Sequence, residues 1–252
     1  MANLHIMSSG IKEISLPDFE TNEPIKISLE PEKNPVQNAQ NLYKRHQKLK
    51  RARQAVEPLL NQVETEINYL EQVEASLYPL ENYANFSDLE TLQEIRDELI
   101  EQGYLTDNNY NRSSQNRPNK LENLNCYRYF SPSGFQILIG RNNIQNDLLT
   151  FRIANDYDLW FHTQEIPGSH SLLRLTPGAV PDQSDLQFTA DLTAYYSRAR
   201  QSEQAPVVYT ELKHVYKPKG AKPGMVVYKH ETVIWGKPLT INHTLIDQKK
   251  DS

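Results

Sequence analysis

Two histidines and an aspartate lie within thirteen residues of the chain, at Asp158, His162 and His170. If residues 159–163 form a β-strand, Asp158 and His162 project from one face of it, and the turn at 167–168 brings His170 back beside them. Imidazole and carboxylate groups this close can ligate a metal ion or exchange protons, so a metal-dependent hydrolase is one hypothesis. No third histidine or cysteine ligand has motif spacing. This favours half-buried structural histidines, and we expect neither a metal nor any other cofactor.

Nucleophilic catalysis has weaker support. Ser169 follows a Pro-Gly pair but lacks the second glycine of the Gly-x-Ser-x-Gly elbow, and Cys126 has no local partner signature. As the lone cysteine, Cys126 cannot form an internal disulfide, which fits the reducing cytoplasm. We therefore expect no catalytic residue and a protein that is not an enzyme.

The segment 213–224 concentrates positive charge, with four lysines, two prolines and two glycines. Proline and glycine exclude it from the interior of a helix or strand and predict a stiff, exposed loop. Ammonium groups held close together favour phosphate as the ligand, and the rings of Tyr209, Tyr216 and Tyr228 can stack on bases. A merely solvated loop is the alternative. The phosphate contacts predicted in this segment are Lys213, His214, Lys217, Lys219 and Lys222.

Further nucleic-acid contacts are predicted outside this segment. Arg141 and Asn142 lie between a predicted strand and a helix start, where side chains and helix-terminal N–H groups can hold phosphate. Arg174 is predicted as an additional contact. His162 and His170 are expected to shape or line the adjacent surface.

The net charge of −5 and the pI near 5.8 ordinarily argue against a nucleic-acid partner. This average hides three blocks. Residues 44–53 carry six basic side chains and no acid, residues 57–101 carry twelve carboxylates against Arg96, and residues 213–237 carry six lysines against Glu231. The first block predicts a second basic surface, formed by Lys44, Arg45, Lys48 and Arg51.

Hydropathy predicts no membrane partner. The mean hydropathy is −0.69, and no apolar run approaches the ~18 residues of a membrane span. The first twenty residues contain no hydrophobic signal-peptide core. We expect a soluble, cytoplasmic protein.

A heptad repeat predicts a coiled-coil arm within residues 34–105. Asn34 can cap its first helix, with Pro35 at the first helical position. At ~1.5 Å per residue, a helix from residue 35 to about residue 78 is roughly 65 Å long and projects as an arm. The apolar positions that fall seven apart are Leu42, Leu49, Val56, Val63, Leu70 and Leu77.

A return helix is predicted to start at the cap Ser87 and to stop at Gly103. It is too short to cover the long helix. Two alternatives follow: Pro58 breaks the long helix into two segments, or part of the seam pairs with something outside this chain.

The remaining segments complete an α+β fold class. Two short strands around a turn at 22–24 predict a β-hairpin within residues 1–33. Residues 106–125 are rich in Asn and Ser and predict a flexible linker, and residues 126–252 predict a compact α+β domain. Its strands are expected at 127–130, 135–140, 159–163, 171–175, 207–209, 225–228 and 232–235. Its helices are expected from about 146 and from a capping box of Ser184 and Gln187 to about Arg200.

Five motifs of this domain resemble, in sequence and order, the NFACT-R domain. This is the RNA-associated module of the bacterial RqcH proteins, also called fibronectin-binding protein A homologues, and of eukaryotic NEMF. The hairpin, the coiled coil and residues 98–105 are similar to the family's middle region. The five motifs are residues 140–147, 158–162, 167–170, 196–200 and 213–226.

The resemblance implies ribosome-associated quality control. Proteins of this family bind a large ribosomal subunit obstructed by peptidyl-tRNA, recruit alanyl-tRNA and promote alanine tails, and their arm reaches along the subunit. It implies rRNA and tRNA as partners, and the family's N-terminal NFACT domain in cis or in trans. The family's older name implies a fibronectin-binding surface adhesin as an alternative.

Overall fold

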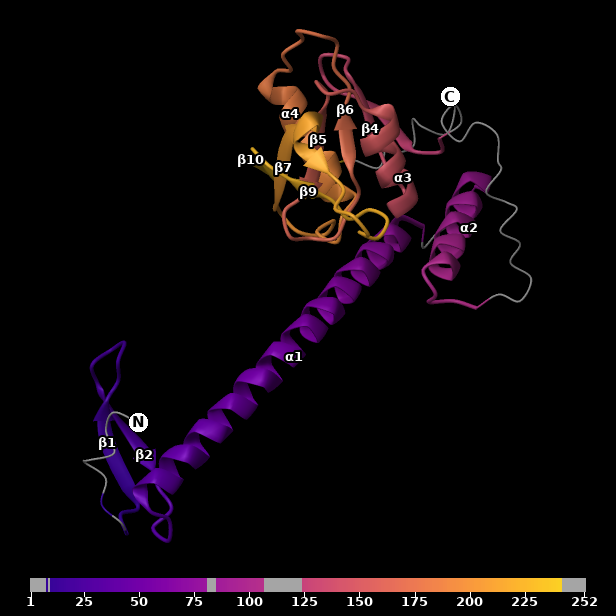
Figure 1. The fold of residues 1–252 in the computed structure, drawn as a ribbon. Helices are drawn as coiled ribbons and strands as arrows, with labels where there is room; N and C mark the ends of the chain where they lie inside the picture. Colours follow the sequence, from indigo (N-terminus) through magenta and orange to yellow (C-terminus); the bar gives the residue numbers. More distant parts are fainter. Residues whose placement is uncertain (1–7, 9, 81–84, 107–123, 242–252) are drawn as a thin grey trace. The chain divides into compact units, whose positions relative to one another are not determined.

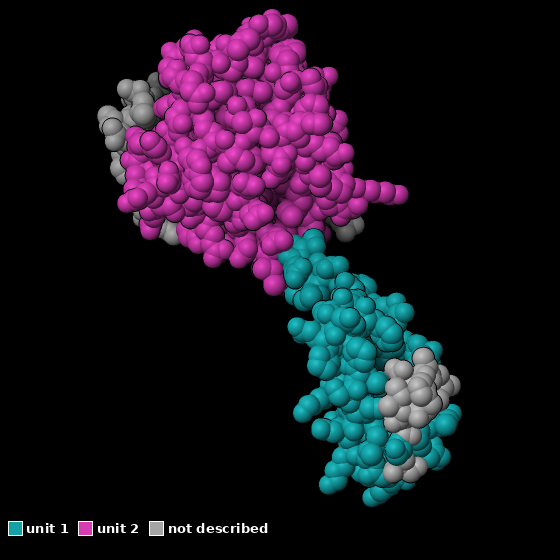
Figure 2. Space-filling model, turned by 90° about the vertical axis from the view of Figure 1, so that its left-hand side faces the viewer, with its two compact units in different colours: residues 1–65 teal, residues 66–252 magenta. Residues whose placement is uncertain are grey.

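The computed structural model describes residues 8, 10–80, 85–106 and 124–241, and the chain divides into two compact units, 1–65 and 66–252 (Figure 2). Helix α1, Pro35–Leu77, runs through the boundary and contributes residues to both units (Figure 1). Of the helices in the described ranges, none is both long and apolar enough to span a lipid bilayer.

Unit 1 begins with a β-hairpin of β1, Glu13–Pro17, and β2, Pro24–Ser28. The two strands are antiparallel, with Ile14 opposite Ile27. Asn22 in the turn has a φ of 61°, a left-handed conformation that asparagine adopts more readily than most residues. The hairpin predicted from the sequence is confirmed.

Side-chain caps define the start of α1. Asn34 Oδ1 accepts the N–H of Gln37 at 2.8 Å, and Gln37 Oε1 accepts the N–H of Asn34 at 3.0 Å. This reciprocal pair satisfies N–H groups that have no partner within the helix. The buried Asn38 donates to the carbonyl oxygens of Glu30 and Lys33 at 2.9 and 3.1 Å, which ties the segment after β2 to the helix. The predicted cap at Asn34 is confirmed.

Pro58 lies inside a continuous α1, so the alternative in which it breaks the long helix into two segments is wrong. A proline removes one backbone hydrogen bond, and a helix of 43 residues retains the others. The heptad positions of unit 1 are 37–60% exposed, namely Leu42, Leu49, Val56 and Val63. The pairing of this seam with a second helix stays a prediction.

The helical part of unit 2 consists of the last turns of α1, a 3₁₀ turn at Tyr78–Leu80 and helix α2, Phe86–Glu101. Their shared core contains Tyr69, Val73, Leu80 and Ile95. The predicted return helix is therefore present and packs on the end of α1.

The cap of α2 differs from the prediction by two residues. Asn85 Oδ1 accepts the N–H of Asp88 at 3.0 Å, so Asn85 is the cap and the assignment of Ser87 is wrong. Ser87 instead lies in the first turn, where its hydroxyl donates to Asn125 Oδ1 at 2.7 Å. Gly103 follows the end of α2 with a φ of 81°, which confirms the predicted stop.

Six antiparallel strands form the main sheet of unit 2, in the order β10-β7-β5-β6-β4-β3 (Figure 1). A separate two-stranded ribbon pairs β8 with β9. The strands are β3 Tyr127–Phe130, β4 Gln136–Ile139, β5 Leu159–Thr163, β6 Ser171–Leu173, β7 Ala205–Glu211, β8 Val215–Tyr216, β9 Val227–Tyr228 and β10 Thr232–Gly236. The helices are α3 Asn143–Leu148, continued by a π-helical turn at Leu149–Ile153, and α4 Gln183–Tyr195.

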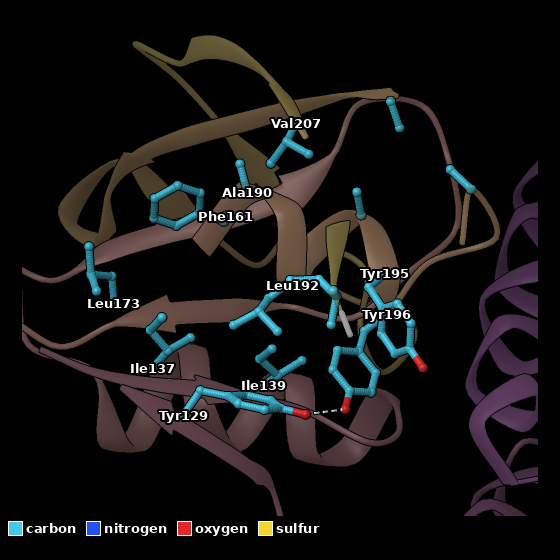
Figure 3. Packing of buried hydrophobic residues seen from close by; sticks show 14 residues of the cluster. Tyr129, Ile137, Ile139, Phe161, Leu173, Ala190, Leu192, Tyr195, Tyr196 and Val207 are labelled. Atoms are coloured by element: carbon cyan, nitrogen blue, oxygen red, sulfur yellow. Dashed lines mark hydrogen bonds between the residues drawn. The ribbon is translucent and has the colours of Figure 1, made fainter. Parts of the chain in front are cut away.

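Helix α4 covers one face of this sheet and forms the largest core of the unit (Figure 3). Leu192 of the helix and Phe161 of β5 are fully buried there. The hydroxyl groups of Tyr129 and Tyr196 lie 2.5 Å apart at the rim, so that both buried polar groups have a partner. Burying a side chain of the size of Leu192 or Phe161 contributes about 1.5–3 kcal/mol, which stabilises the packing of α4 on the sheet.

Both helices of the α+β domain begin earlier than predicted. Asn142 Oδ1 accepts the N–H of Gln145 at 2.9 Å, so α3 starts at Asn143. The cap of α4 is Asp182, whose partner in the capping box is Asp185, and the predicted pair of Ser184 and Gln187 is wrong. Helix α4 also ends at Tyr195 rather than near Arg200, because the chain there turns to pair with Gly168.

The segment 213–224 is more ordered than predicted. It starts in a 3₁₀ turn at Leu212–His214 and includes the short strand β8. Of the predicted linker 106–125, residues 107–123 lie outside the described residues.

Candidate nucleic-acid interface

The structure brings the two histidines together, as predicted. The ring centroids of His162 and His170 are 5.5 Å apart, and those of Trp160 lie 5.8 and 5.1 Å from them. His170 Nε2 lies 3.1 Å from the carbonyl oxygen of Gly224, which can only accept, so this nitrogen carries the proton. The other ring nitrogen then accepts from the hydroxyl of Thr150 at 2.8 Å. Both nitrogens of His170 are therefore in use within the fold.

Burial keeps both imidazoles neutral. It lowers the pKa of His162, and it lowers the pKa of His170 well below 6.5, with the neighbouring His162 adding to the effect. His162 Nε2 also lies 3.2 Å from the carbonyl oxygen of Gly168, to which it donates. The described residues contain no group of three or more His, Cys, Asp or Glu side chains that could hold a metal ion. Through its hydrogen bond to Gly224, His170 contacts the end of the lysine-rich segment directly.

Asp158 does not join the histidines in a reactive group. It is fully buried and accepts the N–H groups of Asn155 and Leu175, each at 2.8 Å. Its Oδ2 also lies 2.9 Å from Arg174 Nε in an ion pair. With these partners the carboxylate has a structural role, and the guanidinium of Arg174 is held partly exposed beside it.

Arg141, predicted as a phosphate contact, is a buried link between β4 and α2. Its guanidinium forms an ion pair with Asp88, donates to the hydroxyl of Ser87, and lies 4.7 Å from the ring centroid of Tyr127. Only 4% of its side chain is exposed. A carboxylate of α2 thus occupies the position that the sequence assigned to phosphate, and Arg141 is not available to RNA in this conformation.

The neighbouring amides also bind α2. Asn142 and Gln145 donate to the same oxygen of Glu94 at 2.7 and 2.8 Å, and Asn143 donates to Glu98 at 3.1 Å. Asn142 is buried, so its predicted phosphate contact is not available either. Carboxylates of α2 therefore neutralise Arg141 and accept hydrogen bonds from the amides beside it. This gives part of the acidic block a structural role.

Two lysines of the segment 213–224 anchor it to the rest of unit 2. The ammonium of Lys217 forms an ion pair with Asp147, whose other oxygen accepts the N–H of Gly224 at 3.2 Å. The ammonium of Lys222 lies 4.7 Å from the ring centroid of Tyr69 and 4.6 Å from that of Tyr104. Cations are attracted to aromatic faces at such distances. These anchors give the segment a defined conformation.

The remaining cations of the segment face outward. Lys219 is exposed and has no ion-pair partner within the described ranges. Lys213 is half exposed, with Glu211 as its partner, and the rings of His214 and His230 have their centroids 4.6 Å apart. We call Lys213, His214, Lys219, Lys229 and His230 the open cationic face.

Lys229 and His230 were missed by the sequence reasoning. Lys229 donates its N–H to the carbonyl oxygen of His214 at 3.1 Å, so the pairing of β8 with β9 brings it to this face. Because the segment before Gly224 was expected to be a loop, no strand register was available to reveal that neighbour.

In unit 1, the predicted basic surface lies along α1. Lys44, Lys48 and Arg51 are spaced four and three residues apart and therefore share one side of the helix, with Arg45 beside them. All four side chains are exposed. They form a basic stripe, which none of the described helices and strands covers.

Comparison with known proteins agrees with this architecture. Residues 1–118 match a family described as NFACT N-terminal and middle domains, and residues 125–230 match the NFACT protein RNA binding domain. A solved structure, described as the C-terminal of the fibronectin/fibrinogen-binding protein from Streptococcus suis, is 36% identical with a TM-score of 0.67. The match covers 84% of this chain and 78% of that chain. The long helix, the antiparallel sheet and the lysine-rich segment thus define a middle region joined to an NFACT RNA-binding domain.

The chain belongs to the family of RqcH and NEMF. It is 35% identical to the Rqc2 homolog RqcH of Bacillus subtilis over 239 residues, which cover 94% of this chain and 40% of that protein. It is 37% identical to the protein of the same name from Streptococcus pneumoniae serotype 2 over 226 residues, with 89% and 38% covered. The chain therefore spans about 40% of the length of these curated relatives.

Proposed function

We propose that this chain binds RNA of the large ribosomal subunit and acts in ribosome-associated quality control on subunits obstructed by peptidyl-tRNA. The observation that carries the proposal is the open cationic face: Lys213 and Lys219 are exposed on a segment that Lys217 and Lys222 hold in place. Because the segment is already held in one conformation, it loses little conformational entropy when its ammonium groups bind phosphate. The match of residues 125–230 to an RNA-binding domain supports the same reading.

The basic stripe on α1 provides a second contact. Lys44, Lys48 and Arg51 lie on one side of a long helix, a geometry that suits the regularly spaced phosphates of an RNA backbone. The acidic block that lowers the net charge does not oppose this, because two of its carboxylates are already bound: Asp88 pairs with Arg141, and Glu94 accepts from the amides of Asn142 and Gln145.

The proposal also covers recruitment of tRNA and alanine tailing. The relatives are longer, and we assign tRNA recognition jointly to this chain and to the family's N-terminal NFACT domain, in cis or in trans. The part described here is a binding module that acts in the cytoplasm and carries out no bond-making step.

Cosedimentation with isolated large subunits, with and without peptidyl-tRNA, tests the proposal. We expect the chain to pellet with subunits in a salt-sensitive manner and more fully when peptidyl-tRNA is present. The variant Lys213→Ala/Lys219→Ala should weaken pelleting, whereas Lys12→Ala/Lys26→Ala, which removes the same charge from the hairpin, should not. Pelleting that is independent of salt, or equal loss in both variants, would contradict the proposal.

Binding of fibronectin or fibrinogen is a second candidate. It is favoured by the description of the Streptococcus suis protein, which is 36% identical to this chain. Immobilised fibronectin decides between the two: saturable binding that persists at high salt supports the adhesin, and binding that salt removes indicates only non-specific charge attraction.

A further inference from the structure

The ribbon of β8 and β9 has one buried and one exposed face. Val215 pairs with Tyr228 and Tyr216 pairs with Val227, and successive side chains of a strand point to opposite faces. Val215 and Tyr228 pack towards the sheet, where the Tyr228 ring lies 5.4 Å from that of Trp160. Tyr216 and Val227 therefore point outward, and they are 38% and 44% exposed.

The outward face is also cationic. Of the five lysines in residues 212–230, Lys219 and Lys229 are exposed without an ion-pair partner among the described residues, and Lys213 is half exposed beside Glu211. The ammonium of Lys229 lies 5.6 Å from the ring centroid of Tyr216, and the N–H of Lys229 donates to the carbonyl oxygen of His214 at 3.1 Å. An exposed aromatic ring is thus flanked by groups that attract phosphate.

The structure distinguishes Tyr216 from the two other tyrosines near this segment. The ring of Tyr209 stacks on Phe161 at 5.2 Å on the face that α4 covers, and the ring of Tyr228 packs on Trp160. Both rings are partly buried and have one face against another aromatic ring. Of these three tyrosines, Tyr216 is the one whose ring is exposed beside Lys229 of the open cationic face.

We propose that Tyr216 is a stacking site for an unpaired base of RNA, with Lys229 contacting the adjacent phosphate. The inference rests on the proposed function and adds the kind of RNA bound. Bases inside an A-form duplex are already stacked on each other and leave no face for a protein ring, whereas single-stranded segments do. The ribbon therefore selects single-stranded over duplex RNA.

Fluorescence anisotropy with a labelled 12-nucleotide single strand and a duplex of the same length tests this. We expect tighter binding of the single strand by the intact chain. Tyr216→Leu should weaken single-strand binding roughly tenfold and duplex binding little, because a stacked base contributes on the order of a tenfold affinity or more. Tyr216→Phe keeps the ring and should bind as the unchanged chain does.

Phe130→Leu is the matched control, because Phe130 is an exposed aromatic residue on β3, at the edge of the sheet opposite β10. It should leave both affinities unchanged. Equal affinity of the intact chain for single strand and duplex, or unchanged single-strand binding by Tyr216→Leu, would overturn the stacking site while leaving RNA binding intact. Failure of the intact chain to bind either RNA would overturn the proposed function itself.

Discussion

The ammonium of Lys222 lies 4.7 Å from the ring centroid of Tyr69, a residue 153 positions earlier in the chain. The ammonium also lies 4.6 Å from the ring centroid of Tyr104 and donates to the Tyr104 hydroxyl, and Glu66 lies 4.0 Å away. The lysine-rich segment is thereby attached to the end of α1 and to the residues that follow α2. A lysine that the sequence assigned to phosphate binding instead links the helical part of unit 2 to its α+β domain.

Replacement of Lys222 by glutamine should lower the free energy of unfolding by about 1 kcal/mol, because the attraction between the ammonium and the two rings is lost. Urea denaturation measures this. Lys219→Gln is the control and should change the value by less than about 0.5 kcal/mol, since Lys219 is exposed. Equal effects of the two substitutions would show that Lys222 is not an anchor.

Replacement of Arg141 by methionine should destabilise the chain by about 3 kcal/mol, because it removes the buried guanidinium of the ion pair with Asp88. The double variant Arg141→Met/Asp88→Asn should lose less than the sum of the single changes. In RNA titrations under conditions where Arg141→Met is folded, the dependence of affinity on salt should match that of the intact chain. A slope smaller by roughly 0.7–0.9 would show that Arg141 does contact a phosphate.

Glu98 should make stability depend on pH above about 4.5. Burial raises the pKa of Glu98 from 4.5, although hydrogen bonds from Tyr69 and Asn143 oppose the shift. The folded chain thus retains a proton that the unfolded chain loses first. The contribution of protonated Glu98 to the free energy of unfolding is complete below pH 4.5. It is lost as the pH rises through the raised pKa.

Glu98→Gln isolates this effect, because glutamine mimics the protonated carboxyl at every pH. Urea denaturation between pH 5 and pH 9 should show the variant gaining stability relative to the intact chain as pH rises. A constant difference across that range would mean that Glu98 does not titrate there.

For His170 the pH dependence of stability should have the opposite sign, with stability falling as the pH drops below 6.5. Burial holds the pKa of His170 well below 6.5. As the pH falls below 6.5, His170 is therefore protonated in the unfolded chain while it stays neutral in the folded chain. Its contribution is present above pH 6.5 and is lost as pH falls through the lowered pKa. His170→Gln should be less stable than the intact chain at pH 7.5, and the difference should shrink towards pH 5. Thermal unfolding at a series of pH values measures it, and a difference that grows on acidification would refute the assignment.

The basic stripe of α1 should bind RNA from one side only. Lys48→Ala/Arg51→Ala removes two charges of the stripe, while Lys50→Ala/Arg53→Ala removes two from the other side of the same turns. We expect the first pair to weaken cosedimentation with large subunits and to reduce the salt slope by roughly 1.4–1.8. The second pair should have little effect, and equal effects would show that the charge acts without a defined face.

Local interactions made much of the fold predictable. The hairpin, the start of α1 at Asn34 and the stop at Gly103 were recognised because caps, turns and heptads depend on residues a few positions apart. The caps of α2 and α4 were misplaced by two residues because Asn85, Ser87, Asp182 and Ser184 are all good capping residues. Which of them caps depends on how the preceding chain enters the helix.

The sequence by itself determined where positive charge is concentrated and where most helices and strands lie, although β8 falls in a segment expected to be a loop. Only the tertiary structure decided which cations remain open to a ligand. Arg141, Lys217 and Lys222 differ from Lys219 in having Asp88, Asp147 or two tyrosine rings against them, and these partners lie 53 to 153 residues away in the chain. A charged side chain becomes buried when a distant group of opposite charge or an aromatic face packs beside it, and no local pattern in the sequence records that meeting.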